Sequence, residues 1–296
     1  MPSLSYAAPS TVEEAVKLLA GASGLAKPLS GGTDLLVQLR SGRTRPELIV
    51  DTKRIPGMIG IREEAAGFVI GAATPGAVLG EHAALRAAWP GIVEAANLIG
   101  SKQVQGRASM AGNLCNASPA ADSVPALIAA GATVRIAGSR GTREARVEDI
   151  VTGPGRTSLA KDEFIVEFVL PKPAPRTGDA YLRFIPRTEM DIAVVGCGVC
   201  VTLDEKGICR SARVVLGAVA PTAVLVAEAA AALVGHTLDD PTLEMLDGAA
   251  RRICNPIDDK RGTIEYRTKV AGVLARRTAH IAFKRAAGER AGGQAH

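Results

Sequence analysis

Two segments rich in glycine and small polar residues are the parts of this sequence best suited to bind a ligand. The first, residues 28–36, has the sequence PLSGGTDLL, and the second, residues 109–122, has the sequence SMAGNLCNASPAAD. Both combine unhindered backbone N–H groups with hydroxyl and amide side chains, which is chemistry that suits a diphosphate and a ribose. Together the two segments predict a bound dinucleotide.

The first segment also has a simpler interpretation. A Gly-Gly pair ahead of a helix is common as a plain turn, and Gly31-Gly32 lies directly before a helical pattern. The segment lacks the G-x-G-x-x-G spacing of a Rossmann turn and the Gly-Lys-Ser/Thr of a P-loop. If it is functional, the N–H groups of residues 31–35 surround a pyrophosphate, with help from the dipole of the following helix.

The second segment is the more specific of the two. A long ordered loop of small polar residues is costly unless its backbone groups are satisfied, and a tightly bound cofactor would satisfy them. Asp122 at its end could accept a hydrogen bond from a ribose or an adenine. The alternative is a self-packed Ω-loop in which Asp122 caps the next helix.

The elements that position these segments form a mixed pattern. Amphipathic or apolar periodicity predicts helices over residues 11–20, 34–40, 78–88, 91–99 and 123–130. Alternation and β-branched content predict strands over 48–51, 58–61, 67–71, 133–136, 143–146 and 163–170. Because helices and strands do not alternate strictly, an α+β fold is favoured over a doubly wound sheet.

A domain boundary is predicted at residues 171–178. This stretch, PKPAPRTG, has three prolines in five residues and ends in glycine, which is typical of a linker. Beyond it, strands over 192–203 and 212–219 and helices over 222–234, 240–254 and 264–285 predict a second, smaller α+β domain.

Composition excludes several classes of protein. The 296 residues are 47% apolar and 22% charged, as in ordinary globular proteins, and the 3% of aromatics argues against a nucleic-acid surface built on stacked bases. No apolar run approaches the ~20 residues of a membrane span, and no signal peptide is recognisable. The five cysteines have unrelated spacings, which favours a reducing cytoplasm over a disulfide framework.

No metal-binding or catalytic group is predicted. Cys197 and Cys200 form a C-x-x-C, but they lie in an apolar strand, where positions three apart point to opposite faces. They are therefore interpreted as buried small hydrophobes. The four histidines share no ligand spacing, and no nucleophile–base–acid arrangement stands out.

Five motifs in order resemble one known family. They are LSGGTDLL at 29–36, IGSKQV at 99–104, AGNLCNASPAADSVPAL at 111–127, RTEMDIAV at 187–194 and DDKRGTIEYR at 258–267. The chain resembles the FAD-binding medium subunit of the molybdenum hydroxylases, the relatives of xanthine dehydrogenase, carbon monoxide dehydrogenase and aldehyde oxidase. The resemblance extends from about Tyr6 to Arg285.

This resemblance implies a fold and a set of cofactor contacts. The fold is an FAD-binding PCMH (vanillyl-alcohol-oxidase) type domain over residues 1–175, with subdomains of about 1–55 and 56–175, followed by a small C-terminal α+β domain over 178–290. The implied FAD-binding residues are Leu29, Ser30, Gly31, Gly32, Thr33, Asp34, Leu35, Leu36, Ile99, Gly100, Ser109, Met110, Ala111, Gly112, Asn113, Asp122, Ile165 and Arg183.

Three of these positions depart from the family pattern. Arg183 stands where many members have a lysine, Ser109 where threonine is usual, and Ala111 where glycine is usual. Ser109 and Ala111 are small, so we expect them to leave the backbone around the cofactor intact.

The function implied is electron transfer in a cytoplasmic complex. FAD in this chain would receive electrons from [2Fe–2S] clusters of a small subunit, and a large subunit would hold the molybdenum cofactor, in an (αβγ)2 assembly. No nucleic-acid partner and no membrane span are expected. The alternatives are a self-contained FAD-dependent oxidoreductase of the same fold and a dinucleotide-binding module without redox use. These motifs do not identify the substrate that the complex oxidises or the final electron acceptor.

Overall fold

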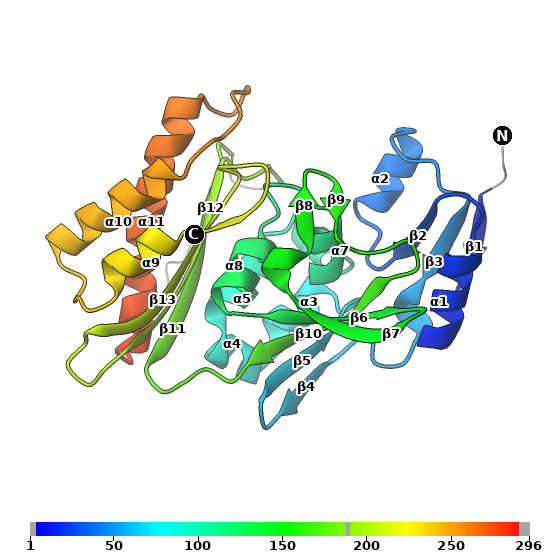
Figure 1. Cartoon of the computed structure of the whole chain (residues 1–296), viewed down its shortest axis with the longest axis horizontal. Helices are drawn as coiled ribbons and strands as arrows, with labels where there is room; N and C mark the ends of the chain where they lie inside the picture. Colours follow the sequence, from blue (N-terminus) through cyan, green and yellow to red (C-terminus); the bar gives the residue numbers. More distant parts are fainter. Residues whose placement is uncertain (1–3, 188–189, 290–296) are drawn as a thin grey trace.

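The computed structural model describes residues 4–187 and 190–289 and divides into three units, each built on one main sheet with its helices (Figure 1). The first unit is a parallel sheet of β1 (Ser5–Ala7), β3 (Leu48–Asp51) and β2 (Ala26–Leu29), in that order. It carries α1 (Val12–Gly21), α2 (Leu35–Arg40) and the short 3-10 helix η1 (Thr52–Arg54). Helix α1 begins where expected, because the Thr11 hydroxyl accepts a hydrogen bond from the Glu14 N–H, at 3.1 Å.

The second unit is built on a five-stranded antiparallel sheet. Its strands are β4 (Ile61–Glu64), β5 (Gly67–Gly71), β10 (Phe164–Pro171), β6 (Thr133–Gly138) and β7 (Gly141–Arg146), in that order. Its helices are α3 (Gly76–Glu81), α4 (Ala83–Ala88), α5 (Pro90–Asn97), α6 (Lys102–Gln105), α7 (Met110–Cys115) and α8 (Ser123–Ala129). The 3-10 helix η2 (Val147–Asp149) and a two-stranded pair, β8 (Val151–Gly153) and β9 (Arg156–Thr157), complete it.

The C-terminal unit is a four-stranded antiparallel sheet with helices on its outer face. Strands β11 (Thr177–Phe184), β12 (Val195–Leu203), β13 (Cys209–Gly217) and β14 (Val224–Leu225) follow in chain order. Helices α9 (Ala227–Leu233), α10 (Asp240–Arg252) and α11 (Ile264–Ala286) cover the outer face, and α5 and α8 lie against the inner face (Figure 1). The architecture is therefore α+β in two parts, as the sequence predicts.

Two hydrophobic cores meet at strand β12. Cys197 is buried in the C-terminal core, while Cys200 packs against the core of the second unit. Burial raises the pKa of both thiols to about 12. The two cysteines thus point to opposite faces, which confirms that they pack as hydrophobes and do not form a pair.

The second glycine-rich segment is not a long loop, and this expectation was wrong. Residues 102–105 and 110–115 are helical, because Ser101 and Ser109 cap α6 and α7. The Ser109 hydroxyl accepts a hydrogen bond from the Gly112 N–H, at 3.2 Å. The Ser109 cap therefore allows residues 110–115 to form a short helix, and residues of its first turn line the cavity described below.

Other boundaries move for local reasons. Strand β4 begins at Ile61, whereas the sequence predicted a strand over residues 58–61. The helix expected over 222–234 begins only at Ala227, because residues 224–225 pair with β13. The strand expected from 192 begins at Val195. None of the helices in the described ranges is long and apolar enough to cross a membrane.

Candidate functional site

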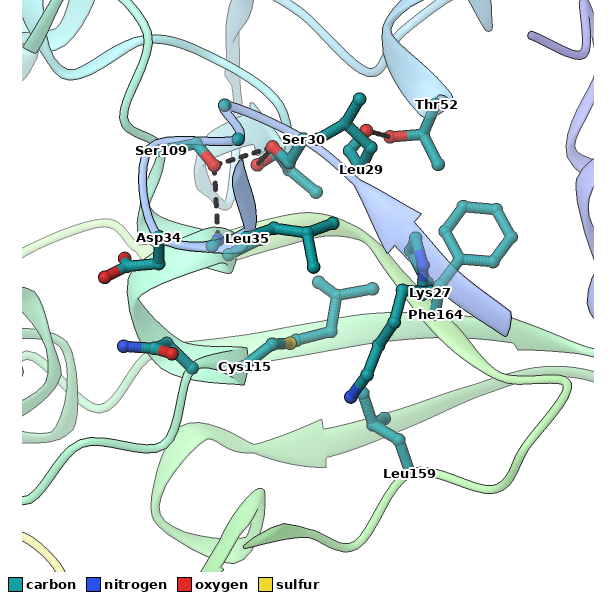
Figure 2. A pocket seen from close by; sticks show the side chains of 18 of the residues that line it. Lys27, Leu29, Ser30, Asp34, Leu35, Thr52, Ser109, Cys115, Leu159 and Phe164 are labelled. Atoms are coloured by element: carbon teal, nitrogen blue, oxygen red, sulfur yellow. Dashed lines mark hydrogen bonds between the residues drawn. The ribbon is translucent and has the colours of Figure 1, made fainter. Parts of the chain in front are cut away.

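A cavity of about 470 Å³ lies between the first unit and the second. Its walls come from segments far apart in the chain, mainly residues 24–35, 108–116 and 157–165, with Thr52, Met58, Ala72 and Ile99 between them. Figure 2 shows side chains from these segments pointing towards one another. The two glycine-rich segments therefore do come together, as their chemistry predicts.

Two glycines allow the segments to meet. A Cβ on Gly31 would lie 2.0 Å from the carbonyl oxygen of Arg107, so a larger residue there would push the segments apart. Gly32 has φ of +81°, in the left-handed region that favours glycine. The Ser30 and Ser109 hydroxyls then form a hydrogen bond of 2.7 Å across the join (Figure 2).

The first loop offers unused hydrogen-bond donors. Among the described residues, no protein atom accepts a hydrogen bond from the backbone N–H of Gly31, Gly32, Thr33 or Asp34. All four residues line the cavity and none is fully buried, so water or a ligand there can accept hydrogen bonds from these donors. An anionic group such as a diphosphate fits this loop.

A lysine that the sequence analysis missed fixes the loop from behind. Lys53 Nζ donates to the Ser30 carbonyl at 2.9 Å and pairs with Asp51 at 2.7 Å. The Ser30 carbonyl and the Gly31 N–H belong to one planar peptide and point in opposite directions, so Lys53 also sets the direction of that N–H. The sequence does contain an indication of this contact, because Asp51 ends a predicted strand and Lys53 follows it two residues later.

Asp51 is held by two donors. The Tyr6 hydroxyl donates to Asp51 Oδ2 at 2.7 Å, and Lys53 Nζ to Oδ1. Burial alone would raise the pKa of Asp51, but the hydrogen bonds from Lys53 and Tyr6 outweigh it and lower that pKa. The carboxylate therefore remains ionised and keeps Lys53 in place.

The second segment is tied to its neighbours through amide side chains. Asn113 Oδ1 accepts hydrogen bonds from the Ser123 hydroxyl at 2.7 Å and from its N–H at 3.1 Å, which joins α7 to α8. Asn116 Oδ1 accepts from Gln38 Nε2 at 2.8 Å, which joins α7 to α2. Gln38 and Asn116 both line the cavity, so the second bond ties α2 to α7 at its wall.

Most of the predicted cofactor-binding residues line this cavity. Those that do are Leu29, Ser30, Gly31, Gly32, Thr33, Asp34, Leu35, Ile99, Ser109, Ala111, Gly112, Asn113 and Ile165. Leu36, Gly100, Met110, Asp122 and Arg183 are not among its lining residues. The individual contacts with the cofactor stay predictions. Lining residues that were not predicted include Lys27, Thr52, Cys115, Leu159 and Phe164.

Asp122 and Arg183 bind each other. Arg183 Nη1 lies 2.7 Å from Asp122 Oδ2, and the Tyr181 hydroxyl donates to Oδ1 at 2.9 Å. Burial raises the pKa of Asp122 to about 6, against the opposing effect of Arg183 and Tyr181. Asp122 stands before α8 without a side-chain capping bond, so its alternative role as a helix cap was wrong. Both of its oxygens already accept hydrogen bonds from the protein.

The two C-terminal motifs contact each other. Asp191 accepts from Arg187 Nε at 3.2 Å and from Arg261 Nε at 3.1 Å, and a backbone hydrogen bond from Ile192 helps to lower its pKa to about 2. Arg267 in turn binds Asp259 at 2.6 Å. Residues 188 and 189 of the first motif lie outside the described residues. The Asp191–Arg261 ion pair joins segments seventy positions apart.

Few titratable side chains face the cavity. Those lining it are Lys27, Asp34, Cys115, Lys161 and Glu163. Both Asp34 and Cys115 keep exposed surface, but partial desolvation by the surrounding protein raises the pKa of Asp34 and raises that of Cys115 to about 12. The described residues contain no cluster of three metal-ligating side chains. The arrangement is suited to binding and orienting a ligand.

The fold and the cavity define a dinucleotide-binding protein, and comparison with known families makes this specific. The model of the FAD binding domain in molybdopterin dehydrogenase matches residues 2–173, and that of the CO dehydrogenase flavoprotein C-terminal domain matches residues 180–282. The chain belongs to the FAD-binding medium subunits of the molybdenum hydroxylases. FAD is therefore its cofactor, and the four free N–H groups fit that cofactor's diphosphate.

Individual relatives agree over nearly the whole chain. The carbon monoxide dehydrogenase medium chain of Hydrogenophaga pseudoflava is 34% identical, over 97% of this chain and 99% of the relative. The xanthine dehydrogenase FAD-binding subunit of Escherichia coli O157:H7 is 31% identical, over 96% and 98%. Among solved structures, carbon monoxide dehydrogenase from H. pseudoflava has a TM-score of 0.92 at 35% identity, over 96% and 98%. Quinoline 2-oxidoreductase from Pseudomonas putida 86 has a TM-score of 0.89 at 26% identity, over 96% and 98%.

Proposed function

We propose that this chain is the electron-transfer subunit of a molybdenum-containing hydroxylase or dehydrogenase. Electrons would arrive from [2Fe–2S] clusters of a small partner subunit and leave to an external acceptor. A large partner subunit would hold the molybdenum cofactor and oxidise the substrate. FAD, when bound, accepts and releases electrons singly or in pairs, and the protein supplies binding and orientation.

The observation that carries the proposal is the run of free N–H groups from Gly31 to Asp34, beside the Ser30–Ser109 hydrogen bond. This loop would hold the diphosphate, with Lys53 fixing its direction from behind. Met58, Ala72 and Ile99 give one part of the cavity an apolar lining that suits a flavin ring.

The side chains around the cavity support electron transfer over acid–base chemistry. Of its five titratable lining residues, Glu163 is bound by Arg143 at 2.7 Å, and desolvation by the surrounding protein raises the pKa of Cys115 to about 12. Neither is free to exchange a proton with a substrate near neutral pH. The residues would therefore bind and shield the cofactor, while substrate oxidation takes place in a partner.

The wider assembly is part of the same proposal. Relatives are named as medium chains or as subunits of dehydrogenase complexes, for carbon monoxide, xanthine and 6-hydroxypseudooxynicotine. Their different substrates support the view that another subunit selects the substrate. We propose an (αβγ)2 complex in the cytoplasm, with an FAD domain over 1–175 and a C-terminal domain over 178–290. Two core clusters support this division.

The test is reduction by a partner. The purified chain should show flavin absorbance near ~450 nm, which a reduced iron–sulfur subunit should bleach on mixing in a stopped-flow instrument. A chain that takes up no FAD on reconstitution would contradict the proposal. Turnover of an organic substrate by the chain alone would favour a self-contained enzyme, and bound FAD that no partner reduces would favour a binding module.

A further inference from the structure

The cavity has two regions of different character. Part of its lining is uncharged and includes Ser30, Met58, Ala72, Ala108 and Ser109. The Ser30 hydroxyl donates to the Ala72 carbonyl at 3.4 Å and so links two of these residues. Lys27, Cys115 and Leu159 lie away from these serines (Figure 2), and the segments 24–28 and 157–161 contribute two lysines to the lining. An electrically neutral flavin ring suits the first region, and an anionic group suits the second.

Lys27 extends into the second region. It lies on β2, opposite Ile49 of β3, and its side chain crosses the cavity towards Leu159 (Figure 2). In the same view the end of its side chain lies between Cys115 of α7 and Leu159 (Figure 2). Lys27 thus faces both α7 and the segment after β9.

Lys27 is also the cation that the protein leaves available. Lys161 donates to the Ala22 carbonyl, whereas no hydrogen bond or ion pair involves the Lys27 side chain among the described residues. Of the two carboxylates, Glu163 is bound by Arg143. Asp34 lies beyond Leu35 and points away from Lys27 (Figure 2). Lys27 is an exposed residue, so its ammonium is open to a ligand anion.

We propose that Lys27 recognises the adenylate half of the cofactor, with its ammonium bound to an oxygen of the phosphate that carries the adenosine. This rests on FAD being the occupant, as proposed above. The loop at Gly31 to Asp34 would hold the diphosphate from one side, and Lys27 would neutralise it from the other. Lys27 would then select FAD over a flavin that lacks the adenylate group.

A ligand series on the flavin-free full-length chain separates the two halves of the cofactor. Binding of FAD, ADP, FMN and riboflavin is measured by calorimetry and flavin fluorescence. We expect K27A to weaken FAD and ADP by about tenfold to a hundredfold, the usual range for a lost charge-assisted hydrogen bond. FMN and riboflavin should stay within about twofold, and K27R should restore most of the ADP affinity.

The control is K17A, which removes the same charge from the exposed face of α1, outside this cavity. It should leave all four affinities unchanged, and circular dichroism should show all variants folded. The proposal is overturned if K27A weakens FMN as much as FAD and spares ADP, since Lys27 would then serve the flavin half. It is also overturned if no affinity changes. A wild-type chain that binds neither FAD nor ADP would instead refute the proposed function itself.

Discussion

The side chains of Ser30 and Ser109 join the two glycine-rich segments directly. Their hydroxyl oxygens lie 2.7 Å apart although the residues are 79 positions apart in the chain, and Ser109 also accepts from the Gly112 N–H. One serine therefore caps a helix and clamps a loop together. The position of the free N–H groups depends on this contact, because it fixes the loop against α7.

Replacing Ser109 tests both roles. S109A should lower the free energy of unfolding by about 1 kcal/mol through loss of the cap and should weaken FAD binding several-fold. S109T keeps the hydroxyl and should behave like the wild type. A cycle of S30A, S109A and the double variant isolates the pair, and strict additivity of the two changes in FAD affinity would contradict the clamp.

Gly31 should tolerate no side chain. In G31A the new Cβ would meet the Arg107 carbonyl at 2.0 Å, so the loop must move and FAD affinity should fall at least about tenfold. G21A is the matched control, since a Cβ on Gly21 would have no neighbour within 4 Å. Unchanged flavin content in purified G31A would show that the loop does not hold the cofactor.

Lys53 should affect binding without touching the cofactor. K53M removes the donor to the Ser30 carbonyl and leaves Asp51 with one fewer partner, so we expect FAD affinity to fall about tenfold and the midpoint of thermal unfolding to drop. Lys172, an exposed lysine outside the cavity, supplies the control K172M. Equal FAD affinities for K53M and K172M would count against this positioning role.

The buried Asp179 should make stability depend on pH. Burial raises its pKa to about 7, above the ~3.9 of an unfolded chain, although the Gly91 N–H donates to it. The folded state then binds more protons, so stability falls as pH rises from about 4 to 7, and the full cost is present above pH 7.

D179N removes that cost. We expect it to unfold at a higher temperature than the wild type at pH 8, by an amount equivalent to a few kcal/mol at most, and to match it near pH 4. D258N, at an exposed aspartate, is the control. Thermal unfolding at several pH values measures both. A D179N curve parallel to that of the wild type would show that Asp179 is not the group responsible.

The sequence predicted the chemistry of the cavity better than its walls. Gly31 and Gly32 could be recognised because their residue type limits the backbone to few arrangements. Lys27 and Leu159 could not, because their roles depend on which strand and loop the fold brings opposite α7. Ser109 was recognised as part of the site but not as a helix cap, since the six residues of α7 are too few to show a helical periodicity. Asp122 was assigned from its carboxylate chemistry and from the resemblance, and its pairing with Arg183 arises only when β11 returns to α8.

Strand β12 limits how the FAD-binding part and the C-terminal part of this protein can be separated. Because Cys197 and Cys200 belong to different cores, the strand is the common wall of both. Cutting the chain at the linker would strip the FAD-binding part of that wall and leave Pro125 and its neighbours on α8 bare. Exchange of C-terminal halves between relatives should therefore succeed only when the inner faces of the two sheets match, however neatly the sequences align at the join.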